Sequence, residues 1–456
     1  MVVGLARSGI AAARYLARRG ARVVATDRKP AWELEAEALK LEEDGVRLEL
    51  GEHRQGTFTG ASLIVVSPGV PWKLPELEAA RRAGVPVIAE LELGYRQITG
   101  TVAAVTGTKG KSTTTAALGA MLREAGEDVR VGGNIGQAIT SLLEGAGKNT
   151  IFVLEVSSFQ LEGSEAFHPK LALFLNLSAD HLDRHTSSEE YRDAKARIFR
   201  KQTVDDWAVV NADDAPVLAL ARASNARLCL FSAARGPSPN PLPESETGPV
   251  AYFENGEARL RREGQSETLF TLASVRLPGS HLAGDLLAAA AAARLLDASP
   301  EAIARAVAHF HGVEHVLERV TEIGGVEFFN DSKATNIDAA QKSLEAFERP
   351  VLAILGGRYK GGDFATLTPV VERHAKAIFA IGEARERIVA ALSSAAPVVW
   401  CNDLHEAVVR AYAAAERGDA VLLCPGCSSF DMFRDYADRG RAFKREVLKL
   451  REEVQG

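Results

Sequence analysis

Cysteine is scarce in this sequence, with 4 residues in a chain of 456. A disulfide framework is therefore excluded as the basis of the fold. Two of the four, Cys424 and Cys427, have the C-x-x-C spacing of thioredoxin-like redox pairs. They follow a predicted strand, and no second C-x-x-C completes a zinc site. The alternatives are a redox pair and, more simply, two small residues that line a turn.

Long hydrophobic runs and a strong net charge are also missing. No apolar run approaches the roughly 18–20 residues needed to span a bilayer, and the first residues lack the charged head and cleavage site of a signal peptide. The formal net charge of −6 gives no reason to expect nucleic acid or anionic lipid as a partner. We therefore expect a cytoplasmic protein with no membrane insertion and no nucleic-acid partner.

The chain has the composition of a globular protein, 46% hydrophobic and 25% charged, but it is too long for one core. Strand and helix patterns alternate along it, which favours α/β architecture with parallel sheets. We predict three domains, residues 1–98, 99–297 and 298–456. Strands are predicted at residues 22–25, 62–66, 151–155, 171–175, 326–329, 351–355, 377–381, 398–401 and 420–423, helices at 115–124, 191–199 and 286–296, and a surface loop at 236–249.

The clearest motif is a glycine-bearing loop between an apolar strand and a helix. Its residues are Thr106-Gly107-Thr108-Lys109-Gly110-Lys111-Ser112-Thr113. Glycines let backbone N–H groups approach an anion, and the helix N-terminus adds partial positive charge. Lys111 can neutralise phosphate oxygens and Ser112 can ligate Mg²⁺. The motif predicts binding of a nucleoside triphosphate, because a loop without a ligand does not explain this order of residues.

Polar residues after the next two strands fit the same site. Glu155 ends an apolar strand, where a carboxylate can hold Mg²⁺. Its neighbour Ser157 could position substrate oxygens. His181 lies in a polar cluster farther along, and a second metal site there competes with a purely structural role. Lys195, on a predicted helix, would by spacing alone be a surface lysine.

The N-terminus has a weaker pattern. Gly4 and Gly9 enclose a turn into a helix, and Asp27 follows about 20 residues later, which is similar to a dinucleotide fingerprint without its middle glycine. If the pattern is functional, the helix start at Ser8 and Gly9 holds a diphosphate and Asp27 faces a sugar or base. The alternative is an ordinary helix–strand turn.

Further runs complete a recognisable set. They are Gly132-Gly133-Asn134-Ile135-Gly136, Leu154-Glu155-Val156-Ser157-Ser158-Phe159-Gln160-Leu161, Asn176-Leu177-Ser178-Ala179-Asp180-His181-Leu182-Asp183, Tyr191-Arg192-Asp193-Ala194-Lys195, Asn330-Asp331-Ser332-Lys333-Ala334-Thr335-Asn336 and Pro425-Gly426-Cys427-Ser428-Ser429-Phe430-Asp431. With the phosphate loop, the set resembles the ATP-dependent Mur ligases of peptidoglycan synthesis over nearly the whole chain. The last two runs are similar to those of the D-glutamate-adding members.

The resemblance implies a fold and a reaction. The fold would be an N-terminal Rossmann-like UDP-binding domain, a central P-loop ATPase-type parallel sheet and a C-terminal Rossmann-like domain. ATP would phosphorylate the carboxylate of UDP-N-acetylmuramoyl-L-alanine, and the amine of D-glutamate would attack the acyl phosphate. Lys111 and two Mg²⁺ ions would offset the repulsion between the two anions. The enzyme is expected to work as a monomer.

The resemblance also implies roles for residues. Catalysis is expected from Lys111, His181 and Lys195, and metal binding from Ser112, Glu155, His181 and Lys195, the last as a carbamate. ATP binding is expected at Gly107, Thr108, Lys109, Gly110, Lys111, Ser112, Thr113, Asp285 and Asp331. The UDP substrate is expected at Ser8, Gly9, Asp27, Ser67, Asn134 and Ser157, and D-glutamate at Lys333, Thr335, Lys360, Ser429 and Phe430.

Some positions depart from the family pattern. Leu282 and Asp285 replace two asparagines, Val316 replaces an arginine, and Lys109 replaces the usual asparagine of the loop. These changes predict altered nucleotide affinity.

Three other interpretations compete. A folylpolyglutamate-synthase-like ligase would not need the first domain. A nicotinamide oxidoreductase would leave Lys111, Glu155 and Lys195 without roles. A non-catalytic UDP-sugar-binding protein would have no reason to keep the residues of both metal sites.

Overall fold

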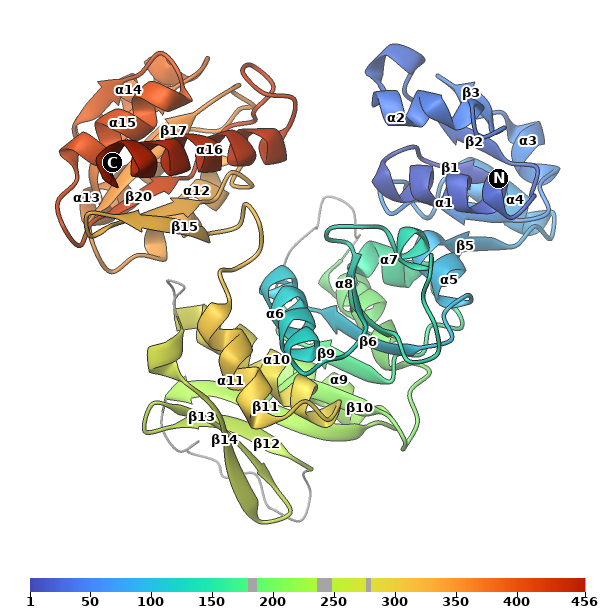
Figure 1. The fold of residues 1–456 in the computed structure, drawn as a ribbon. Helices are drawn as coiled ribbons and strands as arrows, with labels where there is room; N and C mark the ends of the chain where they lie inside the picture. Colours follow the sequence, from blue (N-terminus) through green and yellow to red (C-terminus); the bar gives the residue numbers. More distant parts are fainter. Residues whose placement is uncertain (179–186, 236–247, 276–279, 456) are drawn as a thin grey trace. The chain divides into compact units, whose positions relative to one another are not determined.

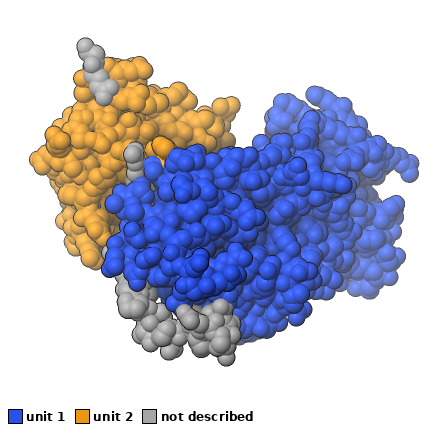
Figure 2. All heavy atoms as spheres, turned by 60° about the horizontal axis from the view of Figure 1, so that its bottom comes forward, with its two compact units in different colours: residues 1–274, 283–308 blue, residues 275–282, 309–456 orange. Residues whose placement is uncertain are grey.

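The computed structural model describes residues 1–178, 187–235, 248–275 and 280–455. It contains three sheets, and Figure 1 gives the order of their elements along the chain. The chain forms two compact units, coloured separately in Figure 2, and each is described by itself. One comprises residues 1–274 and 283–308, and the other comprises residues 275–282 and 309–456.

The first sheet has five parallel strands in the order β3-β2-β1-β4-β5. Its strands are β1 (Val2–Val3), β2 (Val24–Asp27), β3 (Arg47–Leu50), β4 (Ile64–Val66) and β5 (Val87–Ala89), and its helices are α1 (Arg7–Arg18), α2 (Ala36–Leu39), α3 (Gln55–Thr59), α4 (Pro75–Arg82) and α5 (Glu90–Tyr95). The strand order reverses beside β1. In open parallel sheets, ligands bind beyond the carboxyl ends of the strands at such a reversal.

The second sheet has nine strands in the order β14-β13-β12-β11-β10-β9-β6-β8-β7. They are β6 (Thr101–Thr106), β7 (Val129–Gly133), β8 (Ile151–Glu155), β9 (Leu171–Phe174), β10 (Trp207–Asn211), β11 (Arg227–Arg235), β12 (Val250–Glu254), β13 (Glu257–Arg262) and β14 (Gln265–Thr271). The associated helices are α6 (Lys111–Glu124), the 3₁₀ helix η3 (Ile139–Leu142), α7 (Ser158–Glu162), α8 (Ser188–Ala196), α9 (Ala215–Arg222), α10 (Ser280–Leu295) and α11 (Pro300–His309). Because β6 pairs in parallel with both β8 and β9, the loops after these three strands leave the same edge.

The far end of this sheet departs from the expected parallel pattern, since β12, β13 and β14 are antiparallel. Their turns explain the change. Asn255 and Gly256 have φ of 50° and 81°, and Glu263 and Gly264 have φ of 53° and 77°. Two successive residues with positive φ match the twist of a tight hairpin. The Asn-Gly pair is a hairpin cue that the sequence does contain.

The third sheet has the order β15-β16-β20-β17-β18-β19. Its elements are β15 (Glu318–Ile323), β16 (Val326–Asn330), α12 (Ile337–Glu345), β17 (Val351–Gly356), α13 (Thr368–His374), β18 (Ala375–Ile381), α14 (Arg385–Leu392), β19 (Val398–Trp400), α15 (Leu404–Ala414), β20 (Ala420–Leu423) and α16 (Tyr436–Gln455). All pairs are parallel except β15 with β16, which a Gly324-Gly325 turn joins.

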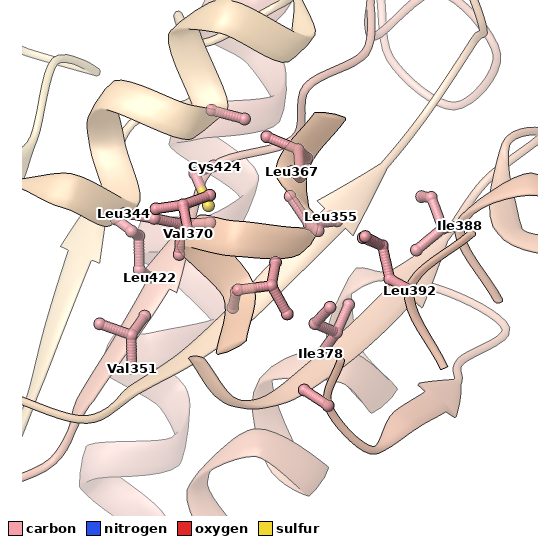
Figure 3. Packing of buried hydrophobic residues seen from close by; sticks show 14 of the residues in the cluster. Leu344, Val351, Leu355, Leu367, Val370, Ile378, Ile388, Leu392, Leu422 and Cys424 are labelled. Carbon is pink, nitrogen blue, oxygen red and sulfur yellow. The ribbon is translucent and has the colours of Figure 1, made fainter. Parts of the chain in front are cut away.

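Both faces of the third sheet are buried. Along β17, Val351 and Leu355 face a cluster that includes Leu344 of α12, Val370 of α13 and Leu392 of α14 (Figure 3). The alternate residues of β17, Leu352 and Ile354, pack in a second cluster with residues of α15 and α16. A strand buried on both faces reads as a continuous apolar run, which is why this strand was recognisable in the sequence.

The α/β architecture with three sheets confirms the predicted fold class. Strand β8 begins and ends at the predicted residues, whereas α6 begins at Lys111, four residues before its predicted start. The predicted loop at 236–249 lies almost wholly outside the described residues, and the limits of the three domains stay predictions. Among the described residues, no helix has the length and apolar character that a membrane crossing requires.

Candidate active site

The phosphate loop runs from the end of β6 to the first turn of α6 and depends on two glycines. Gly107 has φ +156° and Gly110 has φ +80°, and Gly110 is the N-cap of α6. A Cβ on Gly110 would lie 2.1 Å from Oδ1 of Asp285. The position therefore excludes any side chain on two grounds, its backbone conformation and its neighbour.

Asn176, which lies two residues beyond the end of β9, clamps this loop. Its Oδ1 accepts hydrogen bonds from the N–H groups of Thr108 (3.0 Å) and Lys109 (2.8 Å), and its Nδ2 donates to the carbonyl of Lys109 (3.1 Å). The site prediction omitted Asn176. Its position at the carboxyl end of a central parallel strand was the available cue. Inside the loop, Nζ of Lys111 donates to the carbonyl oxygen of Thr108 at 2.8 Å.

A hydroxyl and a carboxylate lie together beside the loop. Ser112 Oγ donates to Glu155 Oε2 at 2.7 Å, and Asn134 Nδ2 donates to Glu155 Oε1, also at 2.7 Å. Glu155 is almost fully buried. Hydroxyl, amide and carboxylate oxygens are the ligands that Mg²⁺ prefers, and it is commonly held by one or two carboxylates and the phosphates of its nucleotide. The predicted pair Ser112 and Glu155 therefore lies in a geometry that fits a magnesium ion.

Lys195 is buried, which corrects the surface location that its spacing suggested. Only 2% of the residue is exposed, and its Nζ donates to the carbonyl oxygen of Gly107 at 2.7 Å. The same atom lies 3.5 Å from Oγ1 of Thr106 and 4.8 Å from the centre of the Tyr191 ring. The structure thus places Lys195 directly under the phosphate loop. His181, the other residue predicted for a second metal, lies outside the described residues.

Asp285, predicted to bind ATP, comes from α10 and packs against the loop glycine described above. Burial raises the pKa of Asp285 to about 7. Its backbone carbonyl accepts a long hydrogen bond of 3.5 Å from Thr114 Oγ1 in α6. The carboxyl group therefore lies at the helix start where phosphate is expected. Because its pKa is about 7, small changes in pH near neutrality change its charge.

The N-terminal turn has the close packing of a phosphate-binding turn. A Cβ on Gly9 would lie 1.7 Å from the carbonyl oxygen of Gly4, so the helix can approach the strand only with glycine there. Asp27 accepts hydrogen bonds from the N–H groups of Leu5 (2.7 Å) and Lys29 (2.9 Å). Ser8 and Ser67 are buried at the same turn. Asp27 thus shapes the turn, and its contact with the UDP substrate stays a prediction.

The two predicted subsites of this unit are connected. Arg7, in the first turn of α1, donates from NH2 to the carbonyl oxygen of Asn134 at 2.9 Å. The side chain of Asn134 holds Glu155, as described above. Ser157, also predicted for the UDP substrate, caps α7 through a reciprocal pair with Gln160. A continuous set of contacts therefore runs from the N-terminal turn to the carboxylate beside the phosphate loop.

The residues predicted for D-glutamate lie on loops after three neighbouring strands, β16, β20 and β17. The N–H of Gly426 donates to the carbonyl oxygen of Ala334 (2.9 Å), which joins the loop of Lys333 and Thr335 to the loop of Ser429 and Phe430. Arg358 and Ser428 exchange two backbone hydrogen bonds, which joins the loop of Lys360 to the second of these. Nζ of Lys360 lies 5.7 Å from the centre of the Phe430 ring. These residues therefore lie on joined loops, and their common role in binding D-glutamate stays a prediction.

Asp331 begins the first of these loops. Burial raises the pKa of Asp331 to about 6, although a hydrogen bond donated by Ser343 acts in the opposite direction and lowers it. Cys424 and Cys427 of the second loop are both buried, and burial raises the pKa of Cys427 to about 12. A thiol with a raised pKa is a poor redox nucleophile, so the packing of small residues is the better of the two interpretations.

A phosphate loop on a central parallel strand, with a hydroxyl–carboxylate pair beside it, defines an α/β protein of the nucleotide-binding class. Three family models match the chain and specify the class further. They are the Mur ligase MurD-like N-terminal domain over residues 1–89, the Mur ligase middle domain over residues 105–293, and the Mur ligase glutamate ligase domain over residues 317–427. The chain belongs to the Mur ligase family.

Relatives match over almost their full length. The UDP-N-acetylmuramoylalanine–D-glutamate ligase of Acidobacterium capsulatum is 45% identical over 99% of this chain and 96% of its own, and that of Geotalea daltonii is 42% identical over 99% and 97%. The family membership confirms the prediction of an ATP-dependent ligase of peptidoglycan precursor synthesis.

Solved structures show the same fold at low identity. UDP-N-acetylmuramate–alanine ligase from Thermotoga maritima has a TM-score of 0.58 at 20% identity, covering 98% of this chain and 99% of that one. The MurF ligase from the same organism, in complex with ADP, has a TM-score of 0.54 at 16% identity, covering 95% and 91%.

Proposed function

We propose that this protein joins UDP-N-acetylmuramoyl-L-alanine to D-glutamate through an amide bond, working as a cytoplasmic monomer. The observation that carries the proposal is the match, over nearly the whole chain, to relatives named for this reaction. The joined loops after β16, β20 and β17 support the choice of amino acid. They bring Lys333, Lys360 and the hydroxyl of Ser429 to one edge of the sheet, and cations with a hydroxyl suit a dicarboxylic acid.

The reaction proceeds in two steps. A carboxylate oxygen of the alanine moiety attacks the γ-phosphorus of ATP, the bond to the bridging oxygen breaks, and ADP leaves. The amine of D-glutamate then attacks the carbonyl carbon of the acyl phosphate. Inorganic phosphate leaves with the bonding electron pair, and the amine loses a proton. The first step makes an inert acid reactive, because phosphate is a far better leaving group than oxide.

The residues of the loop have distinct tasks. Backbone N–H groups around Gly110 and the start of α6 cradle the phosphates, and Lys111 leaves its contact with Thr108 to neutralise the transferred group. Ser112 and Glu155 would hold the first Mg²⁺, which when bound would withdraw charge from phosphate oxygens. Asn134, held by Glu155 and touched by Arg7, orients the UDP substrate.

Lys195 is proposed to carry a carbamate. The ammonium group loses one proton to become an amine, and the amine adds CO₂ and loses a second proton. A cation that would repel a second Mg²⁺ would thereby become an anionic oxygen ligand. Burial beneath the loop and the contact with the carbonyl of Gly107 support the assignment, because they place the amine beside the phosphates. His181 is the proposed partner in this second site.

The test is an ADP-release assay over a panel of amino acids and UDP-sugar acceptors. Release that requires both UDP-N-acetylmuramoyl-L-alanine and D-glutamate is expected. Release with a folyl acceptor would favour a folylpolyglutamate-synthase-like ligase, and acceptor binding without turnover would favour a non-catalytic protein. Lys111→Ala should abolish acyl-phosphate formation and keep binding of the UDP substrate, whereas Lys148→Ala, at an exposed position, should keep both.

A further inference from the structure

Arg439, in the first turns of α16, is among the largest side chains that are completely buried. It forms no ion pair with any residue in the part of the chain that the structure describes. Its hydrogen-bond acceptors are one hydroxyl and two carbonyl oxygens. A buried cation without a carboxylate is costly, so this arrangement needs a compensating benefit.

The hydrogen bonds of Arg439 join two loops of the amino-acid site. Nε donates to Ser332 Oγ (2.9 Å) and NH2 donates to the carbonyl oxygen of Ser332 (2.9 Å), while NH1 donates to the carbonyl oxygen of Cys427 (3.1 Å). Ser332 immediately precedes Lys333, and Cys427 lies two residues before Ser429. One guanidinium therefore sets the separation of the two loops that carry the proposed carboxylate clamp.

The third loop closes on the same group. Gly357 has φ +133°, and a Cβ there would lie 3.1 Å from NH1 of Arg439 and 2.3 Å from the carbonyl oxygen of Ser428. This loop leads to Lys360. The guanidinium thus packs beneath all three loops, and a side chain at position 357 would collide with the Ser428 carbonyl and press on the guanidinium.

Helix α16 is itself anchored to the site. Ser332 Oγ donates to the carbonyl oxygen of Tyr436 at 2.7 Å, and Asn330 Nδ2 donates to that of Gly440 at 3.4 Å. Farther along, Lys444 pairs with Glu318 at 2.9 Å. The match to the glutamate ligase domain ends at residue 427, so it does not include this helix.

We propose that Arg439 is a positioning residue for the amino-acid substrate. It fixes the three loops in register, and no carboxylate among the described residues accepts a hydrogen bond from it, so that the carboxylates of a bound dicarboxylic acid add negative charge close to the guanidinium. The proposal rests on the proposed function, since it requires that such an acid binds these loops. A purely structural role would lower stability without selecting one substrate.

The experiment compares Arg439→Lys and Arg439→Ala with the wild type in the full reaction. Lysine keeps the charge but cannot make three divergent hydrogen bonds. We expect the KM for D-glutamate to rise about tenfold or more in both variants, because hydrogen bonds to charged groups are worth about one order of magnitude in binding. The KM values for ATP and the UDP substrate should stay within about twofold. Guanidinium ion should partly restore the alanine variant, and ammonium ion should not.

The matched control is Arg441, which lies on the same helix with its side chain 45% exposed. Arg441→Lys and Arg441→Ala should leave all three KM values unchanged. Equal changes in the three KM values for the Arg439 variants, no change at all, or loss of folding in both variants would overturn the proposal. A wild-type enzyme that does not use D-glutamate would instead refute the proposed function, so the two failures are distinguishable.

Discussion

A lysine buried under a phosphate loop, as Lys195 is, gives the sharpest test among single residues. If its carbamate is a metal ligand, Lys195→Ala should lose most of the ligase activity, because the second cation then lacks an anionic oxygen. Added short-chain acids such as acetate should restore part of it by supplying a carboxylate to the vacated space. ADP release with and without acetate measures this, and exposed Lys201→Ala serves as the control. A fully active Lys195→Ala would remove the carbamate from the mechanism.

Asp285 should make nucleotide binding depend on pH. Its raised pKa, about 7, means that the carboxyl group is mostly neutral at pH 6 and mostly charged at pH 8.5. A charge beside Gly110 repels ATP phosphates, so ATP affinity should fall across this range. Asp285→Asn should abolish this component and bind ATP more tightly at pH 8.5. Calorimetric titrations of ATP into the wild type and into Asp285→Asn at both pH values separate the effect of Asp285 from the ionisation of ATP itself, because ATP ionisation affects the two proteins equally.

The residues recognised in the sequence were those whose chemistry is local. Ser112 and Glu155 follow strand and loop signals, and the structure brings them within hydrogen-bond distance. The predicted site residues omitted Asn176 and Arg439, because each acts through backbone groups of a segment far away in the chain, Thr108 for the first and Ser332 for the second. The end of a central strand was the cue for Asn176, whereas a guanidinium that holds carbonyl groups, as in Arg439, has no characteristic spacing that a single sequence could reveal.

At the scale of an element, helix α6 offers a controlled test, since it has a glycine with positive φ at each end. Gly110→Ala would strain a backbone at φ +80° and push against Asp285, so ATP affinity should fall at least tenfold, about 1.4 kcal/mol. Gly126, just after α6, has φ +93°, and a Cβ added there would meet no heavy atom within 4 Å. Gly126→Ala should cost about 1 kcal/mol of stability and leave ATP affinity unchanged.

A double-mutant cycle separates the two causes at Gly110. Adding Asp285→Ala removes the collision but keeps the strain, so the pair should bind ATP better than Gly110→Ala alone. Strictly additive effects on the dissociation constant would show that the contact with Asp285 contributes nothing.

Helices and strands were predictable where one pattern of apolar residues continues along the whole element. The fully apolar strand β8 was located to the residue, and α6 was found without its first turn, because Lys111 to Thr114 are polar or β-branched. The hairpins β12–β14 were missed, although Asn255-Gly256 favours a turn, because alternation elsewhere in the chain suggested parallel strands throughout. The order of strands within each sheet depends on long-range pairing, which no local pattern specifies.

At the scale of the whole molecule, a buried carboxyl group connects the first two sheets. Glu90 follows β5, and its Oε1 accepts hydrogen bonds from the N–H (2.9 Å) and the hydroxyl (2.8 Å) of Thr140 in η3, beyond β7. Its Oε2 is buried and has no hydrogen-bond partner among the described residues. Burial raises the pKa of Glu90 from 4.5 to about 7. The neutral acid is therefore the form that suits the folded state.

This predicts how the stability of the molecule changes with pH. Between about pH 4.5 and 7 the unfolded chain ionises Glu90 while the folded chain does not, so this group makes stability fall as pH rises, by on the order of 3 kcal/mol above pH 7. Glu90→Gln keeps the acceptor for Thr140 and cannot ionise. Its unfolding temperature, followed by circular dichroism, should exceed that of the wild type at pH 8 and approach it at pH 5.

Glu92, two residues further along α5, is the matched control, and its substitution should change the unfolding temperature in the opposite direction. It is equally buried, but its carboxylate accepts hydrogen bonds from the N–H groups of Glu165 and Ala166 and pairs with Arg96. Glu92→Gln removes a charge that these partners stabilise, so it should lower the unfolding temperature at pH 8. The two variants should therefore shift the unfolding temperature in opposite directions at pH 8. If both shift it in the same direction, the hydrogen-bond partners of the two carboxyl groups do not determine the effect, and the role assigned to Glu90 is wrong.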